Sequence, residues 1–359
     1  GAEASTAALE GAGVYLADGT LTMAGALISG NSIAAAAGVP ARGAGIATSP
    51  TGNITLSSGT ISQNSITGGA ATGAGVYAPK TFIMDGGAIS GNTAAGGKGG
   101  GVYLPNDSSR FTMSGGSISG NTAASGGGLY LDENDGDLAE AGLSAGASFS
   151  GNTATNGGGI YNLGSLTIGD TVAITGNTAT GGYGGDLYNY GVLNVSGAPK
   201  IGTPEVAGVY IYSGSKPLVI TTNNISGARI YLEEGDITDS RTVVRRDGED
   251  LLITEYRKAI RPVNSGYYIM PDNTDATSKY LLLYEARALP LQTRIDLADG
   301  ENENAPIPVP VWPNDTATAT ATILIGKGSE ARYIRLVPGS GVPGTAFVRN
   351  TNVAGPMFL

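Results

Sequence analysis

Short runs in which apolar and polar residues alternate recur along the first 210 residues and predict β-strands. One run, Val14-Tyr15, follows a Gly-x-Gly corner; Leu21-Thr22-Met23 and Ile28-Ser29-Gly30-Asn31 come after it. A side-chain period of two is typical of strands that bury one face. Runs with the helical period of 3.6 residues are missing, and Gly, Thr, Val, Ile and Tyr dominate. The pattern therefore predicts an all-β fold.

The three runs form a repeat whose period varies between 22 and 33 residues. The Gly-x-Gly-Val-Tyr phrase of Gly11 returns, with some variation, from Gly43, Gly73, Gly99, Gly126, Gly157, Gly184 and Ala207. A single unit cannot bury its apolar side chains, but stacked units can, because each strand then pairs with the turns above and below it at about 4.8 Å. We therefore predict a parallel β-helix of about eight glycine-rich coils over residues 11–210.

Alternation also assigns residues to an inner or an outer face of the coil. Val14 and its equivalents are expected to point inward, and Tyr15 and its equivalents outward, in a column interrupted at Ala47. The column consists of Tyr15, Tyr77, Tyr103, Tyr130, Tyr161, Tyr188 and Tyr210. Two interpretations stay open, a ring stack that stabilises the coil and an exposed face that binds a glycan or a host surface protein.

Each third run ends in an asparagine. Asparagine suits a corner because it tolerates the left-handed backbone region and its amide pairs with identical amides along a rod. The expected structural ladder consists of Asn31, Asn64, Asn92, Asn121, Asn152 and Asn177.

Composition changes after about residue 210. Residues 1–210 hold 47 of the 59 glycines and 18 charged residues, whereas residues 211–359 hold 12 glycines and 32 charged residues. We expect one or two further coils after residue 210, so that the β-helix domain covers residues 1–235. Strand-like runs separated by turn signals then predict a small β-sandwich-like domain over 236–359, with the Pro-rich segment 305–313 as a linker or an edge.

Within this second domain, Thr alternates with Ala over residues 316–322, directly after Asp315. A strand with small side chains on both faces fits a tight groove, in its own sandwich or in a neighbouring subunit. The residues of this candidate assembly strand are Thr316, Thr318, Thr320 and Thr322.

Composition excludes several classes of function. The chain has no Cys and no His, which excludes thiolate nucleophiles, disulfides and imidazole as a base or ligand. A net charge of −10 argues against a nucleic-acid partner. The apolar runs are shorter than the roughly 18 residues of a membrane helix, so we expect no membrane insertion by this chain. Because the chain starts at Gly1 rather than at Met, we expect a processed product.

Catalysis, as a polysaccharide lyase or hydrolase, ranks third among the interpretations of function. Such an enzyme needs carboxylates gathered on the outer face of neighbouring coils. The acids of the repeat region do not share one repeat position; they include Asp18, Asp85, Asp107, Asp170 and Asp186. We therefore expect no enzymatic activity and no catalytic residue.

The densest acidic run lies in the longest loop of the repeat region. Hard oxygen ligands at alternate positions suit Ca²⁺, and the candidate ligands are Asp132, Asn134, Asp135 and Asp137. A solvated turn is the alternative interpretation. The segment 181–189 also fits the letters of a calcium-binding nonapeptide, but a single copy has no second repeat with which to share the ion. No other cofactor is expected.

The phrase Phe149-Ser150-Gly151-Asn152, followed by Gly157-Gly158-Gly159-Ile160, resembles the repeat of polymorphic outer-membrane proteins and of adhesin-like surface proteins of bacteria. The resemblance covers about residues 11–210. It implies a right-handed parallel β-helix, secretion, an extracellular or cell-surface location and a role in adhesion. An architecture of this kind does not by itself identify a ligand.

The repeat begins at Gly11, which leaves only the Ala-rich residues 1–10 as a cap. An uncapped β-helix end exposes unpaired backbone and apolar side chains and favours stacking. We therefore expect a non-enzymatic structural protein that assembles head to tail, as a homopolymer, into an extracellular fibre or coat. A monomeric adhesin that binds through the tyrosine face is the alternative.

Overall fold

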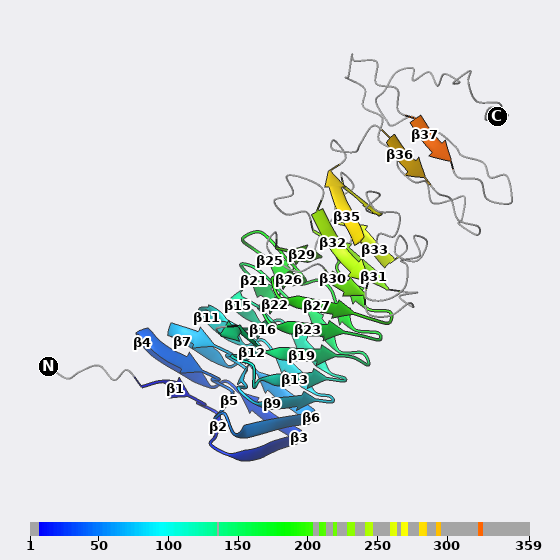
Figure 1. The fold of residues 1–359 in the computed structure, drawn as a ribbon. Coiled ribbons are helices and arrows are strands. Elements are labelled where there is room, and N and C mark those ends of the chain that lie inside the picture. Colours follow the sequence, from blue (N-terminus) through cyan, green and yellow to red (C-terminus); the bar gives the residue numbers. More distant parts are fainter. Residues whose placement is uncertain are drawn as a thin grey trace, which may run out of the picture. The chain divides into compact units, whose positions relative to one another are not determined.

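The computed structural model confirms the all-β, stacked-strand architecture and describes residues 7–134, 136–203, 208–212, 218–220, 228–233, 241–246, 259–263, 267–271, 280–285, 292–295 and 322–325. Parallel strands stack into a β-solenoid of about seven turns (Figure 1), which confirms the stacked coils expected from the repeat. The named elements of the described residues are all strands, and Ala259 is the one described residue with helical geometry. The chain divides into two compact units, Gly1–Glu285 and Ala286–Leu359.

Three ladders of parallel strands correspond to the three runs of the repeat. The first contains β2 (Val14–Leu16), β5 (Ile46–Thr48), β8 (Val76–Tyr77), β12 (Val102–Leu104), β16 (Leu129–Leu131), β22 (Ile160–Asn162), β26 (Leu187–Asn189) and β29 (Val209–Ile211). The second contains β3 (Gly19–Ser29), β6 (Gly52–Ser62), β9 (Thr81–Met84), β13 (Arg110–Met113), β19 (Glu140–Leu143), β23 (Ser165–Ile168), β27 (Val192–Val195), β30 (Leu218–Ile220) and β32 (Arg241–Arg246). The third continues from β3 and β6 through β10 (Ala88–Ser90), β14 (Ser117–Ser119), β20 (Ser148–Ser150), β24 (Ala173–Ile174), β28 (Lys200–Ile201), β31 (Arg229–Leu232) and β33 (Ile260–Pro262).

A fourth ladder follows the asparagine corner. The three runs of the repeat did not predict it. It is a separate sheet of seven strands: β1 (Leu9–Glu10), β4 (Ser32–Arg42), β7 (Ser65–Thr72), β11 (Thr93–Lys98), β15 (Thr122–Ser125), β21 (Thr153–Ala154) and β25 (Thr178–Ala179). It has its own small core of Ile33, Ile66 and alanines such as Ala94. The turns as far as β25 therefore have four sides rather than three.

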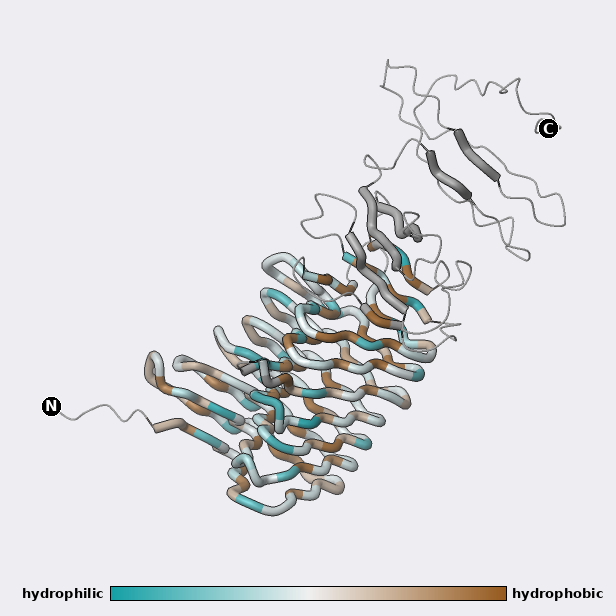
Figure 2. The backbone as a smooth tube through the Cα atoms, viewed as in Figure 1, coloured by the Kyte–Doolittle hydropathy of each residue, from teal (hydrophilic) through white to brown (hydrophobic). Residues whose placement is uncertain are grey.

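The register places equivalent residues of successive turns directly beside one another. Val102 pairs with Leu129, and Tyr103 pairs with Tyr130. The inward residues form the main core, in which Phe82, Phe111 and Phe149 are the largest fully buried side chains. Apolar segments accordingly recur at matching places from turn to turn (Figure 2). Stacking buries what one turn alone would expose.

The glycine corners are required by both conformation and space. Gly99 has a φ of +64°, and a Cβ there would lie 2.9 Å from the Cβ of Tyr103. Gly101 has an ordinary φ, but its Cβ would lie 2.5 Å from the carbonyl oxygen of Gly128 in the next turn. The first glycine of the phrase thus makes the turn, and the last permits close approach of two turns.

Parallel pairing extends beyond residue 235, the expected domain boundary. Strand β33 pairs with β31 at Ile260, and β32 pairs in parallel with β30. On its other side β32 pairs antiparallel with β35 (Tyr280–Glu285), which forms an antiparallel pair with β34 (Tyr267–Pro271). Antiparallel strands therefore end the parallel ladder on this face.

Most of the predicted second domain lies outside the described residues. The Pro-rich segment 305–313 and the residues Thr316, Thr318 and Thr320 are among those outside, and Thr322 begins a strand. The second unit contributes β36 (Gln292–Ile295) and β37 (Thr322–Ile325), which pair in parallel. The β-sandwich-like domain and the assembly strand stay predictions.

Candidate functional site: the tyrosine column and its polar neighbours

Six of the seven predicted column tyrosines form one continuous ring stack on the first ladder. The centroid distances are 5.7 Å for Tyr77–Tyr103, 5.6 Å for Tyr103–Tyr130, 4.9 Å for Tyr130–Tyr161, 4.5 Å for Tyr161–Tyr188 and 5.0 Å for Tyr188–Tyr210. The rings of Tyr130 and Tyr161 are within 3° of parallel. Tyr15 lies outside the stack because its register partner is Ala47.

The stack is more buried than an outer face implies. Tyr103, Tyr130, Tyr188 and Tyr210 are 8 %, 4 %, 9 % and 3 % exposed, whereas Tyr15 is 48 % exposed. Neighbouring rings cover one another's faces, so the stack offers solvent chiefly ring edges and hydroxyl groups. Burial raises the pKa of the Tyr103, Tyr130 and Tyr188 phenols, which are therefore neutral at physiological pH. A binding role for the column stays a prediction.

Three further tyrosines near the last turns are exposed and lie outside the predicted column. The ring centroids of Tyr183 and Tyr210 are 4.4 Å apart, and those of Tyr190 and Tyr212 are 5.3 Å apart. Tyr183, Tyr190 and Tyr212 are 37 %, 41 % and 39 % exposed. The spacing gave a signal for two of them, because Tyr190 and Tyr212 each follow a column tyrosine by two residues and so share its face.

Charged side chains line the stack. The ammonium of Lys98 lies 3.0 Å from Oδ2 of Asp132 and 4.8 Å from the centroid of the Tyr130 ring. The hydroxyl of Tyr103 donates to the same Oδ2 of Asp132. At the other end, the guanidinium of Arg42 lies 5.2 Å from the Tyr77 centroid and 2.7 Å from Glu10. These pairs cross between turns and tie neighbouring coils together.

The predicted calcium ligands do not form a visible cage. The Asp132 carboxylate is already engaged by Lys98 and Tyr103. Asn134 and Asp137 lie on the short antiparallel strands β17 (Glu133–Asn134) and β18 (Asp137–Leu138), and Asp135 lies outside the described residues. The part of the chain that the structure describes contains no group of three or more acidic side chains that could hold a metal ion. Calcium binding stays a prediction.

The asparagine ladder is continuous through six turns and is buried from Asn64 onward. Each Nδ2 donates to the Oδ1 of the next asparagine, at 2.8 Å from Asn31 to Asn64 and 3.0 Å from Asn121 to Asn152. Each Oδ1 also accepts the backbone N–H of the preceding asparagine, as in Asn92 to Asn121 at 2.9 Å. The second Nδ2 hydrogen of each buried member donates to a backbone carbonyl of the previous turn, as in Asn121 to Ile89 at 3.0 Å. The hydrogen-bonding groups of the buried amides are thus satisfied within the structure.

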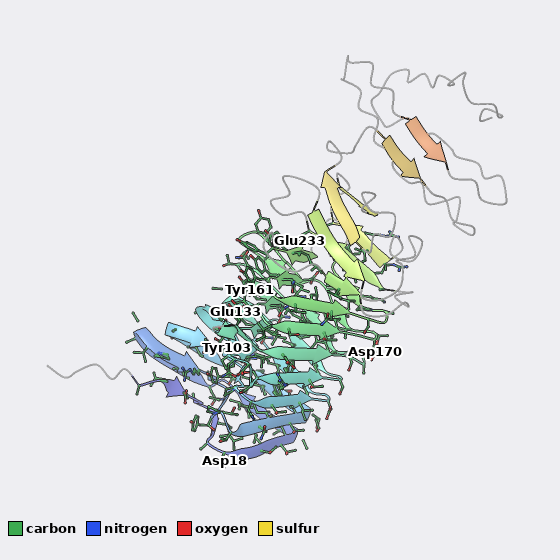
Figure 3. All side chains as sticks on the ribbon, in the orientation of Figure 1. Asp18, Tyr103, Glu133, Tyr161, Asp170 and Glu233 are labelled. Atoms are coloured by element: carbon green, nitrogen blue, oxygen red, sulfur yellow. The ribbon has the colours of Figure 1, made fainter. Side chains whose placement is uncertain are left out.

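Two carboxylates, the buried Asp186 and the half-buried Glu233, follow the asparagine ladder. Asp186 takes the place of the last glycine of its corner, and its Oδ1 accepts the Nδ2 of Asn177 at 2.7 Å. Glu233 accepts the backbone N–H groups of Gly184, Gly185 and Gly208 at 2.6 to 2.8 Å (Figure 3). The pKa of Asp186 is raised to about 6, chiefly by burial; the hydrogen bonds from Asn177 lower it and the nearby Glu233 raises it. Burial also raises the pKa of Glu233.

The remaining repeat-region acids do not converge. Asp18 lies beside the first turn, and Asp170 lies at the opposite edge of the view from Tyr103 (Figure 3). Asp85 accepts a hydrogen bond from Ser114 at 2.8 Å, and Asp107 lies in an exposed turn. The described acids therefore provide no paired carboxylates on the outer face.

No protein-family model matches the chain, and no curated protein or solved structure is significantly similar to it. The solenoid architecture implied by the sequence resemblance is confirmed, while membership of that family is unsupported. None of the described residues belongs to a helix with the length and hydropathy to cross a membrane.

Proposed function

We propose that this chain is a non-enzymatic structural protein of the extracellular surface, which self-associates into a fibre or coat. The proposal rests on one observation: the side chains that recur in the repeat are used in contacts within the fold. The tyrosines stack, the asparagines pair and the glycines make room, so the recurring residues serve the rod rather than a reaction centre. The resemblance to secreted surface proteins supports the proposed extracellular location.

Exposed apolar side chains support self-association. Leu9, Tyr15 and Leu27, all at the first turn, are 41 %, 48 % and 67 % exposed. Large apolar residues gathered at one edge of a rod favour contact with another protein surface. Head-to-tail growth is one mode of such assembly and stays a prediction.

Negative-stain electron microscopy of the full chain, with and without a calcium chelator, tests this function. Assemblies larger than one rod are expected at high protein concentration. We expect chelation to leave them intact, because Lys98 already neutralises Asp132. Isolated short rods in every condition would contradict the structural role, and dissolution by the chelator would instead establish calcium as part of the assembly.

A second candidate function is adhesion through the exposed tyrosines. Tyr183, Tyr190 and Tyr212 present apolar rings with polar hydroxyls, a combination suited to glycans and protein surfaces. A glycan array compared between the wild type and Tyr190→Ala tests it. Adhesion predicts a bound glycan whose signal the substitution removes, and an array without signal for the wild type counts against glycan binding.

A further inference from the structure

Two exposed tyrosines lie ring against ring in the last turns of the first ladder. Tyr190 directly follows β26 and Tyr212 directly follows β29, and their ring centroids are 5.3 Å apart at an interplanar angle of 38°. The ladder fixes this arrangement, because the residues before them, Asn189 and Ile211, are register partners. The backbone N–H of Tyr212 also donates to the carbonyl oxygen of Asn189 at 2.9 Å. Paired backbone therefore holds the two phenols beside each other.

This pair differs from the other ring pairs of the described residues, each of which contains at least one buried ring. Tyr190 and Tyr212 are 41 % and 39 % exposed. Tyr183 is 37 % exposed, but the ring on which it stacks, Tyr210, is 3 % exposed. Tyr15 is exposed but lies outside the ring stack. Within the part of the chain that the structure describes, two phenols that are both in contact and both open to solvent occur here alone.

Neighbouring phenols that both face solvent are suited to oxidative coupling. An exposed phenol gives an electron to a one-electron oxidant and its proton to water, which leaves a neutral phenoxyl radical. Two such radicals in contact form a bond between the ring carbons next to their hydroxyl groups, and the hydrogens on those carbons then move to the oxygens. The product is a dityrosine, and the pair has lost two electrons and two protons. Hydrogen peroxide takes up both and becomes two molecules of water.

The composition of the chain favours oxidation at such phenols. The chain contains no cysteine, whose thiolate would be oxidised before a phenol. Met23, Met84 and Met113 are at most 2 % exposed, so an oxidant in solution does not reach their thioethers. Among the described side chains, the exposed tyrosines are therefore the groups that a one-electron oxidant meets first.

We propose that Tyr190 and Tyr212 are a site of oxidative cross-linking, at which hydrogen peroxide and a haem peroxidase join the two rings into dityrosine. The bond lies within one chain and ties two neighbouring turns, so the proposal does not depend on self-association. A covalent link between turns restricts the unfolded chain and thereby stabilises the folded rod. Covalent links of this kind are of use to a structural protein outside the cell, where oxidising conditions prevail.

The test treats the full-length chain at low protein concentration with hydrogen peroxide and a haem peroxidase, and measures dityrosine fluorescence and intact mass. The proposal predicts a monomer that is lighter by two hydrogen atoms, with a yield per chain that does not change on dilution. Lys200 is the only basic residue between Tyr190 and Tyr212, so trypsin separates the two tyrosines in the unfolded protein unless they are linked. Tandem mass spectrometry of the linked fragments is expected to place the bond at these two residues.

Two single substitutions provide matched variants. Tyr190→Phe keeps the ring and removes the phenol, and we expect it to lower the dityrosine signal of the monomer to that of untreated protein. Tyr183→Phe removes a phenol of similar exposure whose stacked neighbour is buried, and we expect it to leave the yield unchanged. Circular dichroism of both variants verifies the fold.

Three results would overturn the proposal. The first is a wild type that forms no dityrosine under conditions in which free tyrosine does, and the second is an equal yield from the wild type and Tyr190→Phe. The third is a bond at other tyrosines, including bonds between chains whose yield falls on dilution, which would leave the proposed self-association standing. Conversely, a wild type that stays monomeric in sedimentation but forms the predicted bond would contradict self-association alone.

Discussion

At the scale of single residues, the repeat is specified by side chains whose polar groups are fully used. Asn121 accepts two hydrogen bonds from Asn92, donates its side chain to Ile89 and Asn152, and is completely buried. The amide nitrogen donates to the turns on both sides, and the amide oxygen accepts from the previous turn. Neither a carboxylate nor a hydroxyl can reproduce that set of contacts.

Replacement of Asn121 by Ala should destabilise the rod strongly. The substitution leaves a backbone N–H, a side-chain N–H and a carbonyl buried without partners, and we expect a loss of about 3 kcal/mol or more in the free energy of unfolding. Urea denaturation followed by circular dichroism measures it. Asn53→Ala is the control, because the Asn53 side chain makes only long bonds of 3.4 and 3.5 Å near the surface. Equal effects of the two substitutions would refute the ladder's role.

Two glycines separate the effect of space from that of residue type. In Gly101→Ala the new methyl group would meet Gly128 of the next turn, whereas in Gly142→Ala nothing lies within 4 Å. Neither glycine has a positive φ. We expect Gly101→Ala to cost about 2 kcal/mol by forcing two turns apart and Gly142→Ala to be neutral or slightly stabilising. Thermal unfolding of both variants checks this difference.

The sequence predicted the asparagine ladder but not the groups that end it. Asn31 and its equivalents stand at one repeat position, so stacking alone brings them together. Asp186 and Glu233 stand where the sequence departs from the repeat, so its periodicity does not predict their hydrogen bonds. A signal was present, since Asp186 replaces a corner glycine where the next turn lacks its asparagine.

The Asp186 carboxyl makes stability depend on pH in a predictable direction. Its pKa rises from the ordinary 3.8 to about 6, so the folded state binds this proton more tightly than the unfolded state does. The resulting stability is complete below about pH 4 and is lost as the pH rises through about 6, by up to about 3 kcal/mol. The raised pKa of Glu233 acts in the same direction.

We therefore expect Asp186→Asn to stabilise the protein at pH 7.5 and to flatten this pH dependence. The amide keeps an acceptor for Asn177 and removes a buried charge. Thermal unfolding of wild type and variant at pH 5 and pH 7.5 provides the comparison. A variant less stable than the wild type at pH 7.5 would show that the ionised carboxylate is required.

At the scale of elements, the tyrosine column acts as a second, outer core along the first ladder. Alternation correctly placed these tyrosines on the side opposite Val102 and its equivalents. It did not predict their burial, which arises because each ring packs on the next and over a corner glycine, as Tyr103 does over Gly99. Burial of this kind depends on the distance between turns rather than on the period within one strand.

Tyr161 offers the clearest test of the stack, since it lies between Tyr130 and Tyr188 with nearly parallel rings. Tyr161→Ala should cost about 2 kcal/mol and reduce the near-ultraviolet circular dichroism of the column. Tyr161→Phe keeps the ring and should retain most of the stability. If the alanine variant were as stable as the phenylalanine variant, the stack would contribute little to the rod.

At the scale of the whole molecule, the two ends of the solenoid are chemically different. Among the described residues, Val14, Leu21 and Ile28 of the first turn are partly buried and Met23 is buried, whereas Leu232 and Ile260 near the other end are almost fully buried. An uncapped first turn is the expectation from the sequence, because the repeat starts at Gly11. The repeat did not predict that parallel pairing continues to β33 or that antiparallel strands follow β32, since these segments lack the repeat phrases.

Self-association is the central claim, and sedimentation velocity of the full-length chain over a wide concentration range tests it most directly. The account predicts species heavier than a monomer, in amounts that rise with protein concentration. A single monomeric species at the highest concentration would contradict it.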